Sequence, residues 1–355
     1  MPEYVIAHQP LENYAMRLLS AQGVPPEKAA LVARVLVSGN LRGVDSHGVQ
    51  LLIFYLEQLA AHDVDPHAEG HVISESGSCL HYDGENGLGA AIARTCCEHG
   101  IRIAKEQGMS MVVARESNHF GMAAFWSQMY SAQGLIGMSF CNASSMVPPW
   151  QGREPRVGTN PICVSVPGGE EQPWLLDMAT TTVAAGKIYK AWINGKSEIP
   201  PGWALDSDGV PTTDVHTALH GGLVAPLGGY KGSGLALMVE ILCSVLSGGA
   251  IATEMGGIRI RGRPMRVSQC FIGIDIARFL PLDQFGARMD QLIRVIKGTP
   301  PARGYDEVLV AGEPELRNQA VRQVTGIPLE EGTWTGLAKH AARLGVEVPE
   351  AVNRA

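Results

Sequence analysis

Hydrophobic positions recur with helical spacing towards both ends of the chain. Between residues 10 and 59, apolar side chains return every three or four positions, and the same pattern reappears at 314–324 and 333–344. This spacing places the apolar side chains on one face of a helix. The sequence therefore predicts helices at both ends of the chain.

The centre of the chain has a different pattern, in which short apolar runs alternate with turn residues. Runs of this length bounded by Gly, Pro and Asp are typical of β-strands, whereas longer apolar stretches indicate buried helices. The expected strands cover 72–82, 109–114, 135–141, 162–166, 174–178 and 269–276. Helices are expected at 88–107, in a segment ending near 132, and at 233–246, with a Pro- and Gly-rich loop at 200–211.

Together these elements predict a mixed α/β protein of the α+β kind, in which both chain ends pack beside a β-rich centre. We expect a discontinuous helical domain formed by residues 1–75 with 312–355. The second expected domain is the central segment, residues 76–311.

Composition narrows the classes of protein. The 355 residues are 45% hydrophobic, which is enough for a large core and excludes a disordered chain. The net charge of -7, from 28 Lys and Arg against 35 Asp and Glu, lacks the basic excess that binding to nucleic acid requires. An anionic membrane surface is disfavoured for the same reason.

Membrane insertion and metal binding are not expected either. The most apolar stretch, 235–252, contains Glu240 and several Ser and Gly residues, so it predicts a buried helix. The seven cysteines show no CxxC spacing and are expected to be reduced thiols. His and acidic residues crowd into 62–71, but interleaved prolines and charges favour a solvated loop over a metal site. Since the first ten residues lack the features of a secretory signal, a cytoplasmic location is expected.

The first candidate for chemistry is the segment DSHG at 45–48. Histidine titrates near pH 6.5, about the range that general acid-base catalysis at neutral pH requires. Ser46 beside His47 can orient one ring nitrogen and leave the other free to exchange a proton. The alternative is a histidine that only caps a helix.

Three further segments are candidates for binding. SNHFG at 117–121 follows an apolar strand, and GTNP at 158–161 by itself indicates only a turn. The segment 226–234, PLGGYKGSG, runs into a helix and contains Lys231, a combination that favours a bound phosphate. GENGLG at 84–89 suggests a Rossmann fingerprint, but Ile92 stands where that motif needs a small residue.

Taken together, these segments resemble the malate/L-lactate dehydrogenase family of the second, non-Rossmann type. The resemblance covers almost the whole chain, in order. It rests on DSHG at 45–48, SNHFG at 117–121, GTNP at 158–161, DMATTTVAAGKI at 177–188, PPGWALDSDG at 200–209, PLGGYKGSGLALM at 226–238 and AGEPELRNQA at 311–320.

The resemblance implies an oxidoreductase that uses NAD or NADP, bound on a mixed, largely antiparallel sheet of the central domain, 76–311. It also implies a homodimer and a small-molecule substrate. The expected reaction interconverts a 2-hydroxy acid, or a related alcohol or amine, and its 2-oxo or imine form. By the same resemblance, His47 is the proton donor or acceptor, Ser46 supports it, and Thr159 and Lys187 contact the substrate. The implied cofactor contacts are His119, Phe120, Asp177, Met178, Ala179, Tyr230, Lys231, Gly312 and Glu313.

One position departs from the family pattern. Members carry an arginine four residues after the catalytic histidine, where it clamps the substrate carboxylate, and Leu51 occupies that position here. Either another cation takes over this role or the substrate is a ketone without a carboxylate. The candidate cations are Arg42, Arg153, Arg156 and Lys187. A nucleotide-binding protein that has lost catalysis is the rival hypothesis, and the presence of both Ser46 and His47 argues against it.

Overall fold

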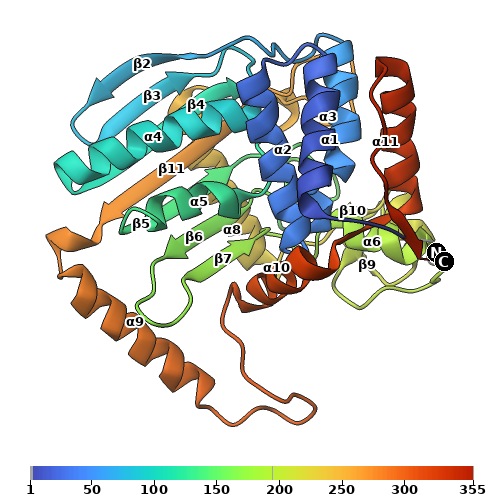
Figure 1. The fold of residues 1–355 in the computed structure, drawn as a ribbon. Helices are drawn as coiled ribbons and strands as arrows, with labels where there is room; N and C mark the ends of the chain where they lie inside the picture. Colours follow the sequence, from blue (N-terminus) through green and yellow to red (C-terminus); the bar gives the residue numbers. More distant parts are fainter. Residues whose placement is uncertain (1–2, 194, 355) are drawn as a thin grey trace.

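A seven-stranded sheet forms the centre of the molecule (Figure 1). The computed structural model describes residues 3–193 and 195–354. The strand order is β2-β3-β4-β11-β5-β6-β7, and only the β3–β4 pair is parallel. The strands are β2 (His71–Ser76), β3 (Cys79–Asp83), β4 (Met109–Ser117), β5 (Leu135–Cys141), β6 (Ile162–Val166), β7 (Trp174–Met178) and β11 (Val267–Asp275). This arrangement confirms the expected mixed α/β fold with a largely antiparallel sheet.

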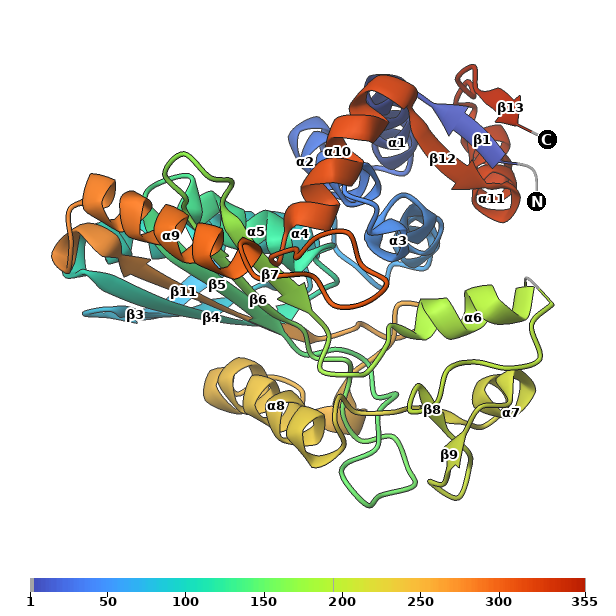
Figure 2. The ribbon, with the colours of Figure 1, turned by 90° about the horizontal axis from the view of Figure 1, so that it is seen from below.

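Helices cover both faces of this sheet (Figure 2). Helices α4 (Gly89–Gln107) and α5 (Ala123–Ser131) lie on one face, and α8 (Tyr230–Glu240) lies on the other. Helix α8 continues into a π-helical turn, η2 (Ile241–Val245), which packs against β11 and β4.

Three glycines create the space for Tyr130, one of the largest buried side chains of this core. Gly137 and Gly273 are cross-strand partners on β5 and β11; a Cβ on Gly137 would lie 2.5 Å from the Tyr130 Cβ, and one on Gly273 would lie 2.7 Å from the Tyr130 ring. A Cβ on Gly100 of α4 would lie 2.0 Å from the Tyr130 hydroxyl. Because Tyr130 is fully buried among them, its packing fixes α4 and α5 on the sheet.

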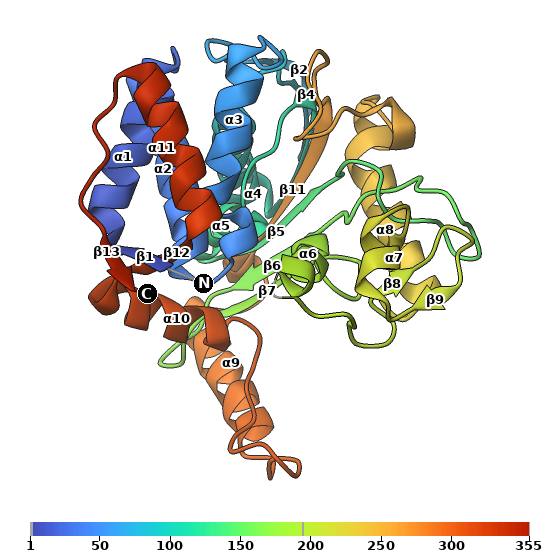
Figure 3. The same cartoon turned by 90° about the vertical axis from the view of Figure 1, so that its right-hand side faces the viewer.

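The two ends of the chain pack together beside this layer (Figure 3). The N-terminal helices are α1 (His8–Ala21), α2 (Pro26–Leu41) and α3 (Gln50–Ala60), and the C-terminal helices are α10 (Glu313–Thr325) and α11 (Glu331–Leu344). A small sheet joins them, with β1 (Glu3–Ile6) between β12 (Ile327–Glu330) and β13 (Val352–Arg354). The helical periodicity of these segments gave no sign of this sheet, because its strands are only three or four residues long.

A third region has a small core of its own, formed by residues including Val183, Ile188, Val215 and Val224. It contains α6 (Ala185–Ile193), α7 (Val215–Leu219) and the short strands β8 (Ala204–Leu205), β9 (Pro211–Thr212) and β10 (Leu223–Val224). The segment 200–211, expected to be a loop, therefore contributes two short strands.

Two other details differ from the expectation. Residues 72–82, expected as one strand, form the β2–β3 hairpin, because Gly77 takes a positive φ of 54° at the turn. A helix that was not expected, α9 (Leu282–Lys297), projects from the body of the molecule (Figure 1). Among the described residues, no helix is both long and apolar enough to cross a membrane.

Candidate active site

His47 lies in a single helical turn, η1 (Asp45–His47), directly after α2. The Ser46 Oγ and the His47 Nδ1 are 3.0 Å apart, within hydrogen-bond distance. A hydroxyl can donate to an unprotonated Nδ1 or accept from a protonated one. Ser46 therefore stabilises the ring of His47 in both protonation states and leaves Nε2 for chemistry.

Two glycines allow this turn to lie close to the end of α2. A Cβ on Gly39 would lie 2.8 Å from the His47 carbonyl oxygen, and a Cβ on Gly48 would lie 2.3 Å from Oδ1 of Asn40. Neither distance is possible for a real side chain, so both positions require glycine. The position of His47 is therefore fixed by close packing of this turn against the backbone of α2 and the Asn40 side chain.

His119 faces His47 from the loop after β4. Their rings are stacked, with centroids 5.7 Å apart and an interplanar angle of 25°. The Gly121 N–H donates to the His119 Nδ1 (3.2 Å), and the Tyr55 hydroxyl lies 2.6 Å from the same nitrogen. Because an amide can only donate, Nδ1 is an acceptor, and in the neutral ring the proton is on Nε2.

Burial keeps both histidines neutral. Desolvation, followed by the nearby His47, lowers the pKa of His119 to about 3. Desolvation also lowers the pKa of His47 below its ordinary value of 6.5. At neutral pH, His47 is therefore able to accept a proton, and the His119 Nε2–H is able to donate a hydrogen bond.

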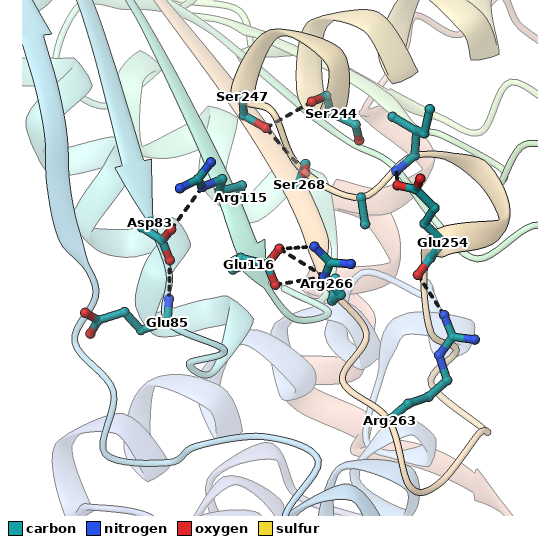
Figure 4. A network of polar contacts seen from close by, with 12 residues as sticks. Asp83, Glu85, Arg115, Glu116, Ser244, Ser247, Glu254, Arg263, Arg266 and Ser268 are labelled. Carbon is teal, nitrogen blue, oxygen red and sulfur yellow. Dashed lines mark hydrogen bonds and ion pairs between the residues drawn. The ribbon is translucent and has the colours of Figure 1, made fainter.

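Ion pairs at the ends of β3, β4 and β11 fix the strand that leads to His119 (Figure 4). Arg115 Nε donates to Asp83 (2.9 Å), and Arg266 makes a bidentate contact to Glu116, with Nη2 2.7 Å from Oε1. Glu116 and Arg266 both adopt positive φ angles, 49° and 58°. Such conformations are costly for these residues. The paired charges therefore help to hold the irregular pairing of β4 with the start of β11, where the register shifts.

The predicted cofactor residues at the end of β7 lie next to the start of α10. A Cβ on Gly312, which has a φ of 95°, would lie 3.0 Å from Leu175 Cβ, so β7 and α10 meet without space for a side chain. Glu313 accepts from the Val310 N–H (2.9 Å) and pairs with Lys297.

Asp177, at the end of β7, accepts from the Ala124 N–H (2.9 Å). Desolvation by the surrounding protein atoms raises the pKa of this carboxyl to about 6. Part of the side chain is nevertheless exposed to solvent. Met178 and Ala179, which follow Asp177, are partly buried.

The glycine-rich turn before α8 is tied to the same edge of the sheet. The Thr159 carbonyl accepts from the Thr180 N–H (2.9 Å), and the Thr180 carbonyl accepts from the Leu227 N–H (3.0 Å). A Cβ on Gly232 would lie 2.3 Å from the Leu227 nitrogen. Tyr230 and Lys231, at the start of α8, are exposed.

Phe120 is the one predicted cofactor residue whose side chain is fully buried. Its ring packs near Trp126 and Phe271, with centroids 6.1 and 6.3 Å away. The Phe120 carbonyl accepts from the Trp126 indole N–H (3.0 Å). Phe120 therefore supports the neighbouring His119 from the core.

The candidate replacements for the missing arginine lie in very different places. Leu51 is 8% exposed in the core of the helical region. Arg42 is 4% exposed, and its Nη1 lies 3.4 Å from amide oxygens of Gln128 and Gln319. The other two arginines lie at the surface and pair with acidic residues, Arg153 with Asp208 and Arg156 with Glu154.

Lys187 remains as an exposed cation, and its neighbour Gly186 lies near Ser46. Lys187 lies on α6, and a Cβ built on Gly186 would lie 3.9 Å from Ser46 Cβ, so α6 packs against the turn η1. Within residues 3–193 and 195–354, Lys187 has no ion-pair partner. No group of three His, Cys, Asp or Glu side chains in these ranges is placed to hold a metal ion.

Comparison with known proteins identifies the family of this chain. The sequence signature described as malate/L-lactate dehydrogenase matches residues 6–338. The chain belongs to this family. It is 37% identical to a malate dehydrogenase of Pyrococcus horikoshii over 95% of this chain and 94% of that one. An L-sulfolactate dehydrogenase of Methanocaldococcus jannaschii is 34% identical over 94% and 95%.

Solved structures agree with this family assignment. The Pyrococcus horikoshii malate dehydrogenase structure has a TM-score of 0.89 at 35% identity and covers 97% of both chains. A δ1-piperideine-2-carboxylate reductase of Pseudomonas syringae, in the same family fold, has a TM-score of 0.84 at 28% identity and covers 95% of this chain and 99% of its own. The family is therefore one of oxidoreductases that resemble hydroxy acid dehydrogenases.

Sequence reasoning missed two kinds of residue in this site. The first is Tyr55 of α3, whose hydroxyl contacts His119. The second comprises Asn40 of α2 and Arg322 of α10, which hold the Asp45 carboxylate. For Tyr55, the only signal in the sequence was its position in an otherwise apolar helix.

Proposed function

We propose that this protein is an NAD- or NADP-dependent oxidoreductase that interconverts a small 2-hydroxy acid and its 2-oxo form. His47 exchanges the proton with the substrate oxygen. The observation that carries the proposal is the Ser46–His47 hydrogen bond, in a turn that also faces the neutral His119. An acid-base group needs this combination of an oriented ring and a free second nitrogen.

The residues of the chain fit a dinucleotide cofactor. The Asp177 carboxylate is open to solvent and retains acceptor capacity for ribose hydroxyls. Lys231 adds a positive charge at the start of α8, where a helix favours phosphate groups. We propose that these groups hold the cofactor, with His119, Phe120, Met178, Ala179, Tyr230, Gly312 and Glu313 around it. When bound, the nicotinamide supplies or accepts the hydride.

Ser46 allows His47 to act in both directions. In substrate reduction, the imidazolium gives its Nε2 proton to the developing alkoxide, and the remaining Nδ1–H donates to Ser46 Oγ. In alcohol oxidation, neutral Nε2 takes the hydroxyl proton. The lowered pKa of His47 favours this second role at neutral pH, because the ring is then unprotonated.

We propose that Lys187 binds the substrate carboxylate in place of the missing arginine, with Thr159 as a further contact. The proposal is supported by the packing of α6 against Ser46 and by the exposure of Lys187. An ammonium group pairs with a carboxylate as a point charge and lacks the bidentate geometry of arginine. Since Leu51 supplies no charge at the position of the family's arginine, a ketone without a carboxylate is the second candidate substrate class.

We also propose a homodimer. Helix α8 and the turn η2 expose Leu237, Ile241 and Val245, which recur at four-residue spacing along one continuous helical segment. Exposed apolar side chains arranged in this way favour contact with a second copy of the chain. Light scattering at several protein concentrations tests the assembly, and a monomer at all of them would refute it.

The function is tested by following the absorbance of NADH and NADPH with a panel of 2-oxo acids, cyclic imines and ketones. Activity with 2-oxo acids is expected, and His47→Ala is expected to lower kcat with little change in cofactor affinity. His62→Asn, an exposed loop position with a φ of 58°, serves as the matched control. Near-normal kcat for His47→Ala would refute the role of His47. Tight cofactor binding without activity on any substrate would favour a binding protein.

A further inference from the structure

The carboxylate of Asp45 is held by a residue of the preceding helix α2 and a residue of the distant helix α10. Arg322 of α10 places Nη1 2.7 Å from Oδ1 and Nη2 3.1 Å from Oδ2, which is a bidentate ion pair. Asn40 of α2 donates from Nδ2 to Oδ1 at 2.7 Å. Arg322 is largely buried, with a side-chain exposure of 17%. Asp45 is the first residue of the turn that carries Ser46 and His47, so these contacts fix the start of that turn.

Asn40 fixes the other end of the same turn. Its Oδ1 accepts from the Val49 N–H at 2.8 Å, and its side chain is 2% exposed. Arg322 Nη1 also donates to the Asn40 carbonyl oxygen. A single buried amide therefore connects the residue before Ser46 to the second residue after His47, and Arg322 holds both Asp45 and Asn40.

Helix α10 lies along the whole segment that enters the turn. Asn318 places its amide beside Gly43, and Gln319 contacts the Arg42 guanidinium at 3.4 Å. Arg322 follows one turn later, at Asp45. The opposite end of α10 begins at Gly312 against β7, where the cofactor is proposed to bind. One rigid helix therefore joins the proposed cofactor site to the turn of His47.

We propose that Arg322 is a positioning residue for proton transfer, which acts on His47 through Asp45 and Asn40. This inference rests on the proposed function. The bidentate pair and the Asn40 bridge set the direction of the His47 ring and keep Nε2 in line with the substrate oxygen. Misplacement of a reacting group by about 1 Å costs up to roughly 100-fold in rate, so a change at Arg322 should appear in kcat.

The test replaces Arg322 with Met, which keeps the length of the apolar stem and removes the guanidinium. The expected result is a fall of kcat by roughly 10- to 100-fold, a KM within a few-fold of the original, and a larger primary isotope effect with deuterated NADH or NADPH. Arg322→Lys restores part of the rate, because it restores the charge without the bidentate geometry. Guanidinium ion added to Arg322→Met is also expected to raise kcat.

Arg343→Met is the matched control. This arginine also links a C-terminal helix to the N-terminal region, through Gln22 at 2.6 Å, but it lies on α11 away from His47. It is expected to leave kcat and the isotope effect unchanged. If Arg322→Met does not fold, Asp45→Asn weakens the same ion pair while keeping the shape of the side chain, and it should lower kcat in the same direction.

A double variant separates positioning from a general structural effect. In the His47→Ala background, Arg322→Met should lower the residual kcat no further, because the group it positions is absent. A further loss in that background, or a kcat for Arg322→Met equal to that of Arg343→Met, would overturn the inference. Normal turnover by His47→Ala alone would instead refute the proposed function, so the two failures are distinguishable.

Discussion

The contacts of His119 predict a specific loss of stability in acid. In the folded protein, Nδ1 accepts from the Gly121 N–H and faces the Tyr55 hydroxyl, while burial lowers the pKa to about 3. In the unfolded chain, a histidine titrates at about 6.5. Between these two values the unfolded chain binds one more proton than the folded protein. Stability is therefore fully present above pH 6.5, about the unfolded pKa, and is lost as the pH falls below it.

The size of this loss follows from the linkage. One proton difference changes the free energy of unfolding by about 1.4 kcal/mol per pH unit inside the window. Most of the interval from about pH 7 to about pH 5 lies inside it, so His119 alone removes about 2 kcal/mol of stability between these conditions. This is a large part of the stability of an average protein.

Urea unfolding of the original protein and of His119→Asn at both pH values measures this contribution. The Asn Oδ1 takes the place of Nδ1 as an acceptor and does not titrate. The variant should lose about 2 kcal/mol less than the original protein on acidification. His62→Asn, at the exposed loop position, should behave like the original protein. An equal loss for His119→Asn and the original protein would refute the proposed neutral, buried state of His119.

Three further predictions follow from other contacts. Gly48→Ala should lower the free energy of unfolding by about 2 kcal/mol, because the Asn40 amide must move and lose its hydrogen bonds to Val49 and Asp45. Gly332→Ala, which has open space around its Cβ, should leave the free energy of unfolding unchanged. Asn160→Ala should cost about 3 kcal/mol in urea unfolding, because the fully buried amide bonds to the Ala143 N–H, the Ala236 carbonyl and Glu240. The kcat of alcohol oxidation should fall when the pH drops below the lowered pKa of His47, because the ring must be neutral to accept a proton. The kcat of the reverse reduction should fall as the pH rises through the same pKa. Parallel pH profiles in the two directions would contradict the acid-base role of His47.

Short apolar runs predict the central strands well because each carries side chains that are buried against the rest of the molecule. The ranges 135–141, 162–166 and 174–178 match β5, β6 and β7 residue for residue. In contrast, α9 was not predicted, and much of its apolar face, including Leu292 and Val295, is exposed. The strand β1 was also missed, since pairing of four residues with a partner more than 300 positions away leaves no local pattern.

In the candidate site too, contacts between neighbouring residues could be predicted from the sequence, whereas contacts between distant segments could not. The Ser46–His47 pair is adjacent in sequence, and an orienting hydroxyl beside a histidine could be proposed from the sequence alone. The partner of Asp45 could not be, because Arg322 is 277 positions away and nothing in the sequence of its helix distinguishes it from arginines that stay exposed. The sequence therefore shows Asp45 only as a neighbour of His47, whereas in the structure it pairs with Arg322 and Asn40.

Every part of the proposed site depends on a contact with a distant segment. Tyr55 of α3 holds His119, Arg322 of α10 holds the turn of His47, and Thr180 holds the glycine-rich turn before α8. Two of these three contacts come from the helices at the chain ends, which are joined through β1 and β12. Undocking of the C-terminal helices would therefore release His47 while leaving the seven-stranded sheet paired. Under mild denaturant, proton transfer should thus be lost before the sheet unfolds, because the Asp45 carboxylate is half-exposed, whereas the central strands β11 and β5 are mostly buried.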